Sequence, residues 1–124
     1  MSSVCTVLIV DDEKDLLEMY KDYFEMENFT VFTSLNAKDG LEIFDAHSEI
    51  QVIISDSHMS GMSGLDFLKE LGQKSSKPLF YLATGDLDQT DEAIITLGGT
   101  GLLTKPFDMG EIIKRILKDL NGKA

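Results

Sequence analysis

The chain has 124 residues, of which 43% are hydrophobic and 27% charged, values typical of one globular domain with a single core. Its 22 acidic and 11 basic residues give a formal net charge of −11, which argues against binding to nucleic acid or to an anionic membrane surface. No apolar run approaches the roughly 18–20 residues of a membrane span, and the first residues lack the features of a secretory signal peptide, so we expect a cytoplasmic protein.

The chain contains one cysteine, Cys5, which excludes an internal disulfide. It lies within an apolar run, and no second cysteine is present to complete a redox or zinc site. We therefore predict that Cys5 is a small, buried core residue.

Short apolar runs alternate with segments of helical periodicity along the whole chain. In chain order, a strand is predicted at 4–10, a helix at 16–24, a strand at 29–33, a helix at 37–44 and a strand at 50–55. A helix follows at 64–71, a strand at 78–83, a helix capped by Asp86 and ending at Leu97, a strand at 102–103 and an amphipathic helix at 112–120. This alternation predicts an α/β fold, with a doubly wound, five-stranded parallel sheet and helices on both faces.

Chemically useful side chains follow the predicted strands. Asp11 and Asp12 come after the first strand, Asp56 after the third, Thr84 after the fourth and Lys105 after the fifth. Because the carboxyl ends of parallel strands meet at one edge of a sheet, we expect these side chains to converge there.

The expected carboxylate cluster favours a hard divalent cation, since clustered carboxylates raise one another's pKa unless a cation neutralises them. Mg²⁺ is the expected cation, and Mn²⁺ or Ca²⁺ are possible substitutes because the cluster offers oxygen ligands. A carboxylate beside such an ion can attack phosphorus and form an aspartyl phosphate. Thr84 and Lys105 supply the hydroxyl and the positive charge that phosphoryl oxygens require.

Five motifs carry a resemblance to a known family. They are Val10-Asp11-Asp12-Glu13, Ser55-Asp56 with Met59, Gly61-Met62-Ser63-Gly64, Ala83-Thr84-Gly85 and Thr104-Lys105-Pro106-Phe107. In this order and spacing the chain resembles the receiver domain of bacterial two-component response regulators, from about Thr6 to Leu120. The resemblance implies a flavodoxin-like fold and a single receiver domain spanning residues 1–124, of the stand-alone, chemotaxis-regulator-like kind.

The resemblance also implies roles for the acidic residues. Asp56 would be the phosphoacceptor, Asp12 would bind Mg²⁺ directly and Asp11 largely through water, and the backbone carbonyl of His58 would be a further metal ligand. The donor would be a sensor histidine kinase or a histidine phosphotransfer protein, and the downstream target would be another protein. No nucleic acid or membrane partner is expected, and the chain would be a monomer or weak dimer.

The basic and hydroxyl residues receive roles from the same resemblance. Thr84 and Lys105 would contact the phosphoryl oxygens, and the peptide bond between Lys105 and Pro106 would be cis. Such a domain is not a dedicated enzyme, although it catalyses phosphotransfer to itself and loses the phosphoryl group slowly. Whether it is a terminal output regulator or a relay intermediate stays open.

The chain departs from the family pattern at Ser60, Leu102 and His58. Ser60 stands where a proline is usual, and Leu102 stands where the family commonly has a tyrosine or phenylalanine that rotates on activation. His58 and Asp86 occupy positions that can influence loss of the phosphoryl group. The replacement at Leu102 implies that the coupling between the site and the output surface is either weaker or carried by other residues.

Three other functions are compatible with parts of the pattern. A hydrolase with an aspartyl nucleophile would carry a second aspartate two residues later, but His58 stands there. A nucleotide- or flavin-binding domain would need its glycines between a strand and a helix, whereas Gly98 and Gly99 precede the last predicted strand. An interaction module with a vestigial acidic pocket is disfavoured because every expected site position is filled.

Overall fold

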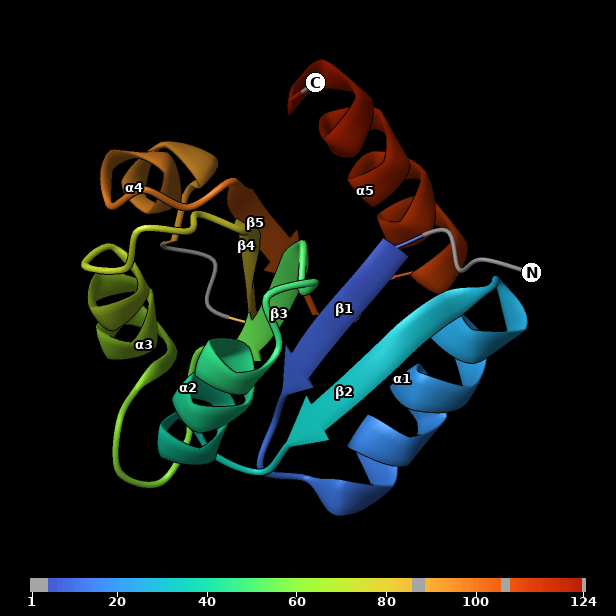
Figure 1. Cartoon of the computed structure of the whole chain (residues 1–124), viewed down its shortest axis with the longest axis horizontal. Coiled ribbons are helices and arrows are strands. Elements are labelled where there is room, and N and C mark those ends of the chain that lie inside the picture. Colours follow the sequence, from blue (N-terminus) through green and yellow to red (C-terminus); the bar gives the residue numbers. More distant parts are fainter. Residues whose placement is uncertain (1–4, 86–88, 106–107, 124) are drawn as a thin grey trace.

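The computed structural model describes residues 5–85, 89–105 and 108–123. Within these residues the sheet has five parallel strands in the order β2-β1-β3-β4-β5 (Figure 1). The strands are β1 (Cys5–Val10), β2 (Phe29–Ser34), β3 (Val52–Asp56), β4 (Leu79–Thr84) and β5 (Gly101–Thr104). The predicted five-stranded parallel sheet is therefore confirmed.

Helices cover both faces of the sheet, as predicted. They are α1 (Lys14–Met26), α2 (Ala37–Ala46), α3 (Gly64–Leu71), α4 (Asp91–Thr96) and α5 (Met109–Lys123). Helices α1 and α5 lie on one face, and α2, α3 and α4 lie on the other (Figure 1). In the part of the chain that the structure describes, no helix has the length and apolar character needed to cross a membrane.

The side chains of β1 alternate between two apolar cores. Val7 and Ile9 pack with α1 and α5, whereas Leu8 and Val10 pack with α2, α3 and α4. Every residue of β1 is buried, because a parallel sheet with helices on both faces leaves its central strands no contact with water. This explains why the sequence of β1 is a nearly continuous apolar run and does not alternate.

The start of α4 differs from the prediction. The helix begins at Asp91, and the Thr90 hydroxyl accepts a hydrogen bond from the Ala93 N–H at 3.2 Å. Asp91 and Glu92 then place negative charge in the first turn, where the helix dipole favours it. The prediction that Asp86 caps this helix is wrong, and Asp86 itself lies outside the described residues.

Cys5 is buried in the core formed with α1 and α5, as predicted. Burial raises the pKa of its thiol to about 11, although a backbone hydrogen bond with Thr6 acts in the opposite direction. The folded chain therefore shields this thiol from reagents and also keeps it protonated.

We expect Cys5 in the folded protein to resist thiol reagents at pH 8, where a pKa near 11 leaves about one thiol in a thousand ionised. The measurement is the rate of reaction with an aromatic disulfide reagent, with the urea-unfolded chain as the control that reacts fully. Rapid stoichiometric reaction of the native protein would contradict the buried position of Cys5.

Candidate functional site

The predicted site residues come together at the carboxyl edge of the sheet. Asp11 follows β1 directly and Lys105 follows β5 directly, whereas Asp56 and Thr84 are the last residues of β3 and β4 and do not follow them. After β1 the chain continues to β2 on one side of the sheet, and β3 lies on the other side of β1 (Figure 1). In α/β proteins, ligands bind beyond the strand ends at the point where the strand order reverses in this way.

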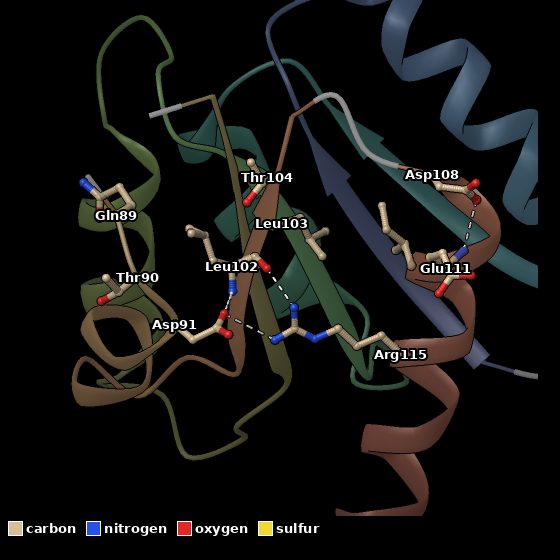
Figure 2. Close-up of a pocket in the computed structure, with 10 residues that line it drawn as sticks. Gln89, Thr90, Asp91, Leu102, Leu103, Thr104, Asp108, Glu111 and Arg115 are labelled. Carbon is tan, nitrogen blue, oxygen red and sulfur yellow. Dashed lines mark hydrogen bonds and ion pairs between the residues drawn. The ribbon is translucent and has the colours of Figure 1, made fainter. Parts of the chain in front are cut away.

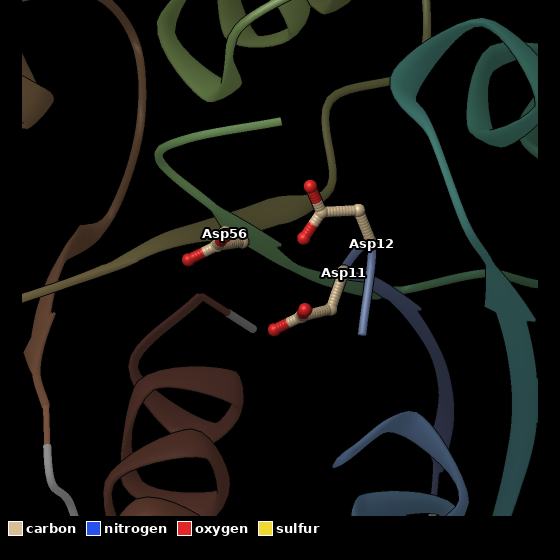
Figure 3. A group of neighbouring side chains, drawn as sticks. All are labelled: Asp11, Asp12 and Asp56. Atoms are coloured by element: carbon tan, nitrogen blue, oxygen red, sulfur yellow. The ribbon is translucent and has the colours of Figure 1, made fainter. Parts of the chain in front are cut away.

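Three carboxylates face one another at this edge of the sheet. Each of Asp11, Asp12 and Asp56 offers an oxygen, and these oxygens lie within 4.8 Å of one another (Figure 3). Asp11 is buried, Asp12 is exposed and Asp56 is partly buried. The Asp11 Oδ1 accepts a hydrogen bond from the Glu13 N–H at 2.9 Å, so the backbone at the start of α1 fixes the most buried carboxylate.

Lys105 brings positive charge to the same edge of the sheet. Its Nζ donates to Oδ1 of Asp56 at 2.7 Å and lies 3.7 Å from Oδ2 of Asp11. Burial alone lowers the pKa of Lys105, but its hydrogen bond with Asp56 and the charges of Asp56 and Asp11 outweigh burial and raise the pKa. The ammonium group therefore stays protonated at neutral pH.

The buried carboxyl of Asp11 is destabilised when ionised. Burial raises its pKa above the ordinary value of 3.8, and the charges of Asp56 and Asp12 add to this, while the hydrogen bond from Glu13 and the charge of Lys105 lower it. Because the folded-state pKa is the higher one, this carboxyl contributes most to stability at pH values below 3.8. That contribution is lost as the pH rises through the folded-state pKa.

The donor set of this cluster fits a hard divalent cation. Three carboxylates face the single ammonium group of Lys105, so negative charge exceeds positive charge among these four groups. Carboxylate oxygens at this spacing suit Mg²⁺, and a bound cation would relieve the cost of ionising Asp11. The acidic cluster predicted from the sequence is thus present, with the residues that would hold the ion.

Thr84 and His58, two further predicted site residues, also lie at or near strand ends. Thr84 is buried at the end of β4, and the His58 side chain is exposed two residues after β3. The metal-binding role of the His58 carbonyl stays a prediction. Pro106 lies outside the described residues, and so the predicted cis peptide bond also stays a prediction.

Sequence reasoning gave no role to two residues that fix the loop after Asp56. The Ser57 N–H donates to the Ala83 carbonyl at 3.0 Å, and the Ser57 carbonyl accepts from the Gly64 N–H at 3.2 Å. A Cβ at Gly64 would overlap the backbone carbonyl of Asp56 and the side chain of Leu82. The signal available in the sequence was Gly64 directly after Ser63, a residue type that favours helix starts.

Residues 7–117 match the family model described as the response regulator receiver domain. The chain belongs to this family. The matched residues include both edge strands, β2 and β5, and the carboxyl ends of β1, β3, β4 and β5 that carry the predicted site residues. This match confirms the resemblance recognised from the motifs.

Individual relatives agree with this assignment. The regulatory protein VanR of Enterococcus faecium is 35% identical over 114 residues, which cover 92% of this receiver domain and 49% of VanR. The crystal structure of a receiver domain protein from Clostridium thermocellum is 28% identical, with a TM-score of 0.88 and 97% of each chain covered. The chemotaxis response regulator CheY4 of Vibrio cholerae is 25% identical, with a TM-score of 0.83 and with 94% of this chain and 98% of CheY4 covered.

The two solved structures support the flavodoxin-like arrangement of the receiver domain. The chain spans about half the length of the curated relatives that it matches, such as VanR and the response regulator SaeR of Staphylococcus aureus. It covers nearly the whole length of the receiver domain structures.

We expect Mg²⁺ to stabilise the receiver domain against urea, by about 2.7 kcal/mol when its concentration is 100 times the dissociation constant. The substitution Asp12→Asn should remove most of this gain because it takes away one carboxylate of the cluster. The control is Asp15→Asn, an exposed aspartate in the first turn of α1. Urea unfolding with Mg²⁺ and with a chelator measures the effect, and an equal gain in both variants would contradict a metal site at Asp12.

We expect Gly64→Ala to lower the free energy of unfolding by about 1–3 kcal/mol, because the added methyl group overlaps the carbonyl of Asp56. The matched change Gly122→Ala in α5 meets no atom within 4 Å and should stay within about 0.5 kcal/mol of the wild type. Urea denaturation followed by circular dichroism compares the two variants. Similar stability for both would show that the close approach at Gly64 is not required.

Proposed function

We propose that this receiver domain accepts a phosphoryl group on Asp56 in a reaction that depends on Mg²⁺. The observation that carries the proposal is the position of Asp56 beside a buried and an exposed carboxylate, with the Lys105 ammonium 2.7 Å from its Oδ1. The donor is a phosphohistidine of a sensor histidine kinase or of a histidine phosphotransfer protein. The phosphorylated domain then signals by a change of conformation or passes the phosphoryl group on.

The transfer requires little acid–base chemistry from the protein. A carboxylate oxygen of Asp56 attacks phosphorus, an oxygen–phosphorus bond forms, and the bond to the histidine nitrogen breaks with its electron pair returning to the imidazole. Lys105 places its positive charge beside the phosphoryl oxygens, and the Thr84 hydroxyl is a further donor from the end of β4. A cation held by Asp11 and Asp12 would supply additional charge neutralisation.

The domain is a signalling module and not a dedicated enzyme, because the phosphoryl group stays on its own side chain. Loss of the group follows when a water oxygen attacks phosphorus, the bond to the Asp56 oxygen breaks and inorganic phosphate leaves. We propose that this autodephosphorylation is slow. We also propose that the His58 side chain, which is exposed two residues after β3, influences this rate.

We further propose that residues 1–124 form one receiver domain that acts in the cytoplasm as a monomer or weak dimer. The downstream partner is a protein, since the net charge of −11 disfavours direct binding to nucleic acid or to an anionic membrane. The named relatives are regulatory proteins and response regulators, which supports a role in two-component signalling.

The test of the proposal is labelling by acetyl phosphate in the presence of Mg²⁺. We expect the wild type to gain one phosphoryl group, detected by intact mass, and Asp56→Asn to gain none because it lacks the attacking carboxylate. Asp66→Asn, an exposed aspartate in the first turn of α3, is the matched control and should be labelled normally. Labelling that persists in Asp56→Asn, or that is unaffected by a chelator, would overturn the proposal.

A further inference from the structure

Two charged side chains hold both main-chain groups of Leu102, the residue that replaces the family's usual aromatic. Its N–H donates to Oδ1 of Asp91 at 2.7 Å, and its carbonyl accepts from Nη1 of Arg115 at 2.8 Å (Figure 2). The two side chains also approach each other, with Nη2 of Arg115 3.5 Å from Oδ1 of Asp91. We name these three residues the Leu102 clamp.

The position of Leu102 in the sheet explains why the clamp can form. Within the described residues, β5 hydrogen-bonds to β4 alone and is therefore an edge strand of the sheet. On an edge strand, the N–H and C=O groups of alternate residues face away from the sheet and need other partners. Asp91 comes from the first position of α4 and Arg115 from the middle of α5, so the clamp joins three elements.

Neighbouring residues make room for the clamp and orient it. A Cβ at Gly101 would overlap the guanidinium of Arg115 and would lie 3.0 Å from Oδ1 of Asp91. The same guanidinium lies 5.2 Å above the ring of Tyr81, and its Nε is 3.8 Å from the Asp119 carboxylate. Arg115 thus contacts β4, β5 and both flanking helices, and glycine is the residue that permits this approach.

The clamp is more than an exposed ion pair. The Asp91 side chain is 57% exposed and that of Arg115 is 34% exposed, so their direct attraction contributes little. The two hydrogen bonds to Leu102 each join a charged group to a backbone group, and such bonds are stronger than neutral ones. Their combined effect is to restrain one residue of a strand that is four residues long.

The restrained strand leads directly into the phosphorylation site. Leu102 lies three residues before Lys105, whose N–H donates to the Thr84 carbonyl and whose Nζ pairs with Asp56. A phosphoryl group on Asp56 adds bulk, negative charge and acceptor oxygens at the place where Nζ now contacts the carboxylate. Lys105 must shift to contact those oxygens. Because the strand between Lys105 and the clamp is short, a shift of Lys105 also moves Leu102.

We propose that the Leu102 clamp stabilises the conformation in which Lys105 pairs with the Asp56 carboxylate, and that phosphorylation of Asp56 weakens the clamp. This inference rests on the proposed function. Release frees the main chain of Leu102 and changes the surface between α4, β5 and α5, where residues from all three elements line a groove of about 610 Å³ (Figure 2). Asp91 and Arg115 are positioning residues in this scheme. They take the coupling role of the aromatic side chain that Leu102 replaces.

Hydrogen exchange at the Leu102 amide gives the most direct test. In the unphosphorylated wild type we expect slow exchange at Leu102, and acceleration of at least about tenfold after labelling with acetyl phosphate and Mg²⁺. The amide of Leu82, opposite Leu102 in the sheet register, should not change. The substitution Asp91→Ala should give fast exchange at Leu102 without phosphorylation, because it removes the acceptor.

The matched control is Glu92→Ala, which removes the same charge from the next residue of α4 and lies outside the clamp. The clamp stabilises the unphosphorylated conformation, and phosphorylation of Asp56 favours the other one. Because such coupling is reciprocal, loss of the clamp should in turn favour phosphorylation. We therefore expect Asp91→Ala to be labelled by acetyl phosphate about fivefold faster than the wild type, and Glu92→Ala to be labelled at the wild-type rate. Arg115→Lys, which keeps the charge but loses the forked donor geometry, should also be labelled faster and covers the case in which Asp91→Ala does not fold.

The possible outcomes separate this inference from the proposed function. If wild-type Asp56 is not labelled at all, the proposed function fails. If the wild type is labelled but the Leu102 amide keeps its exchange rate, the clamp inference is overturned and the proposed function stands. Equal labelling rates for Asp91→Ala, Arg115→Lys and Glu92→Ala would likewise overturn the clamp inference.

Discussion

The ion pair between Lys105 and Asp56 is the contact on which the chemistry of this receiver domain depends. It joins the ends of β5 and β3, which do not pair with each other, across the intervening strand β4. Main-chain hydrogen bonds on both sides of β4 fix the distance: the Lys105 N–H donates to Thr84, and the Ser57 N–H donates to Ala83. The ammonium group offsets part of the repulsion among three carboxylates and leaves enough negative charge to favour a divalent cation.

Burial sets different roles for otherwise similar acidic side chains. Asp11 is buried, so its ionisation costs free energy that a bound cation would recover, and the Glu13 N–H fixes its position. Asp12 is exposed, and Asp56 lies between these extremes, partly buried and within reach of the lysine. The carboxylate that we propose as the phosphoacceptor is thus both accessible to a donor and next to a fixed positive charge.

Strand β5, at the edge of the sheet, connects Lys105 at the site to the Leu102 clamp. Its last residue precedes Lys105, and its second residue, Leu102, is held through its main chain by Asp91 and Arg115. A switch that acts on main-chain hydrogen bonds does not need a large side chain at position 102. The glycine at position 101 fits this arrangement, because a side chain there would displace the arginine. The departure from the family pattern at Leu102 and the clamp are therefore parts of one proposed mechanism.

The sequence by itself determined the five strands, the parallel sheet and the convergence of Asp11, Asp12, Asp56 and Lys105, because buried strands leave apolar runs and parallel strands end at one edge. It misplaced the start of α4, since several polar residues before a helix can cap it and only the folded backbone selects Thr90. The tertiary structure alone decided the role of Gly64 against Asp56 and the contacts of Arg115 with Leu102 and Asp91. These contacts join residues that are distant in the chain, and their distances depend on how helices pack on the sheet, which local periodicity does not encode.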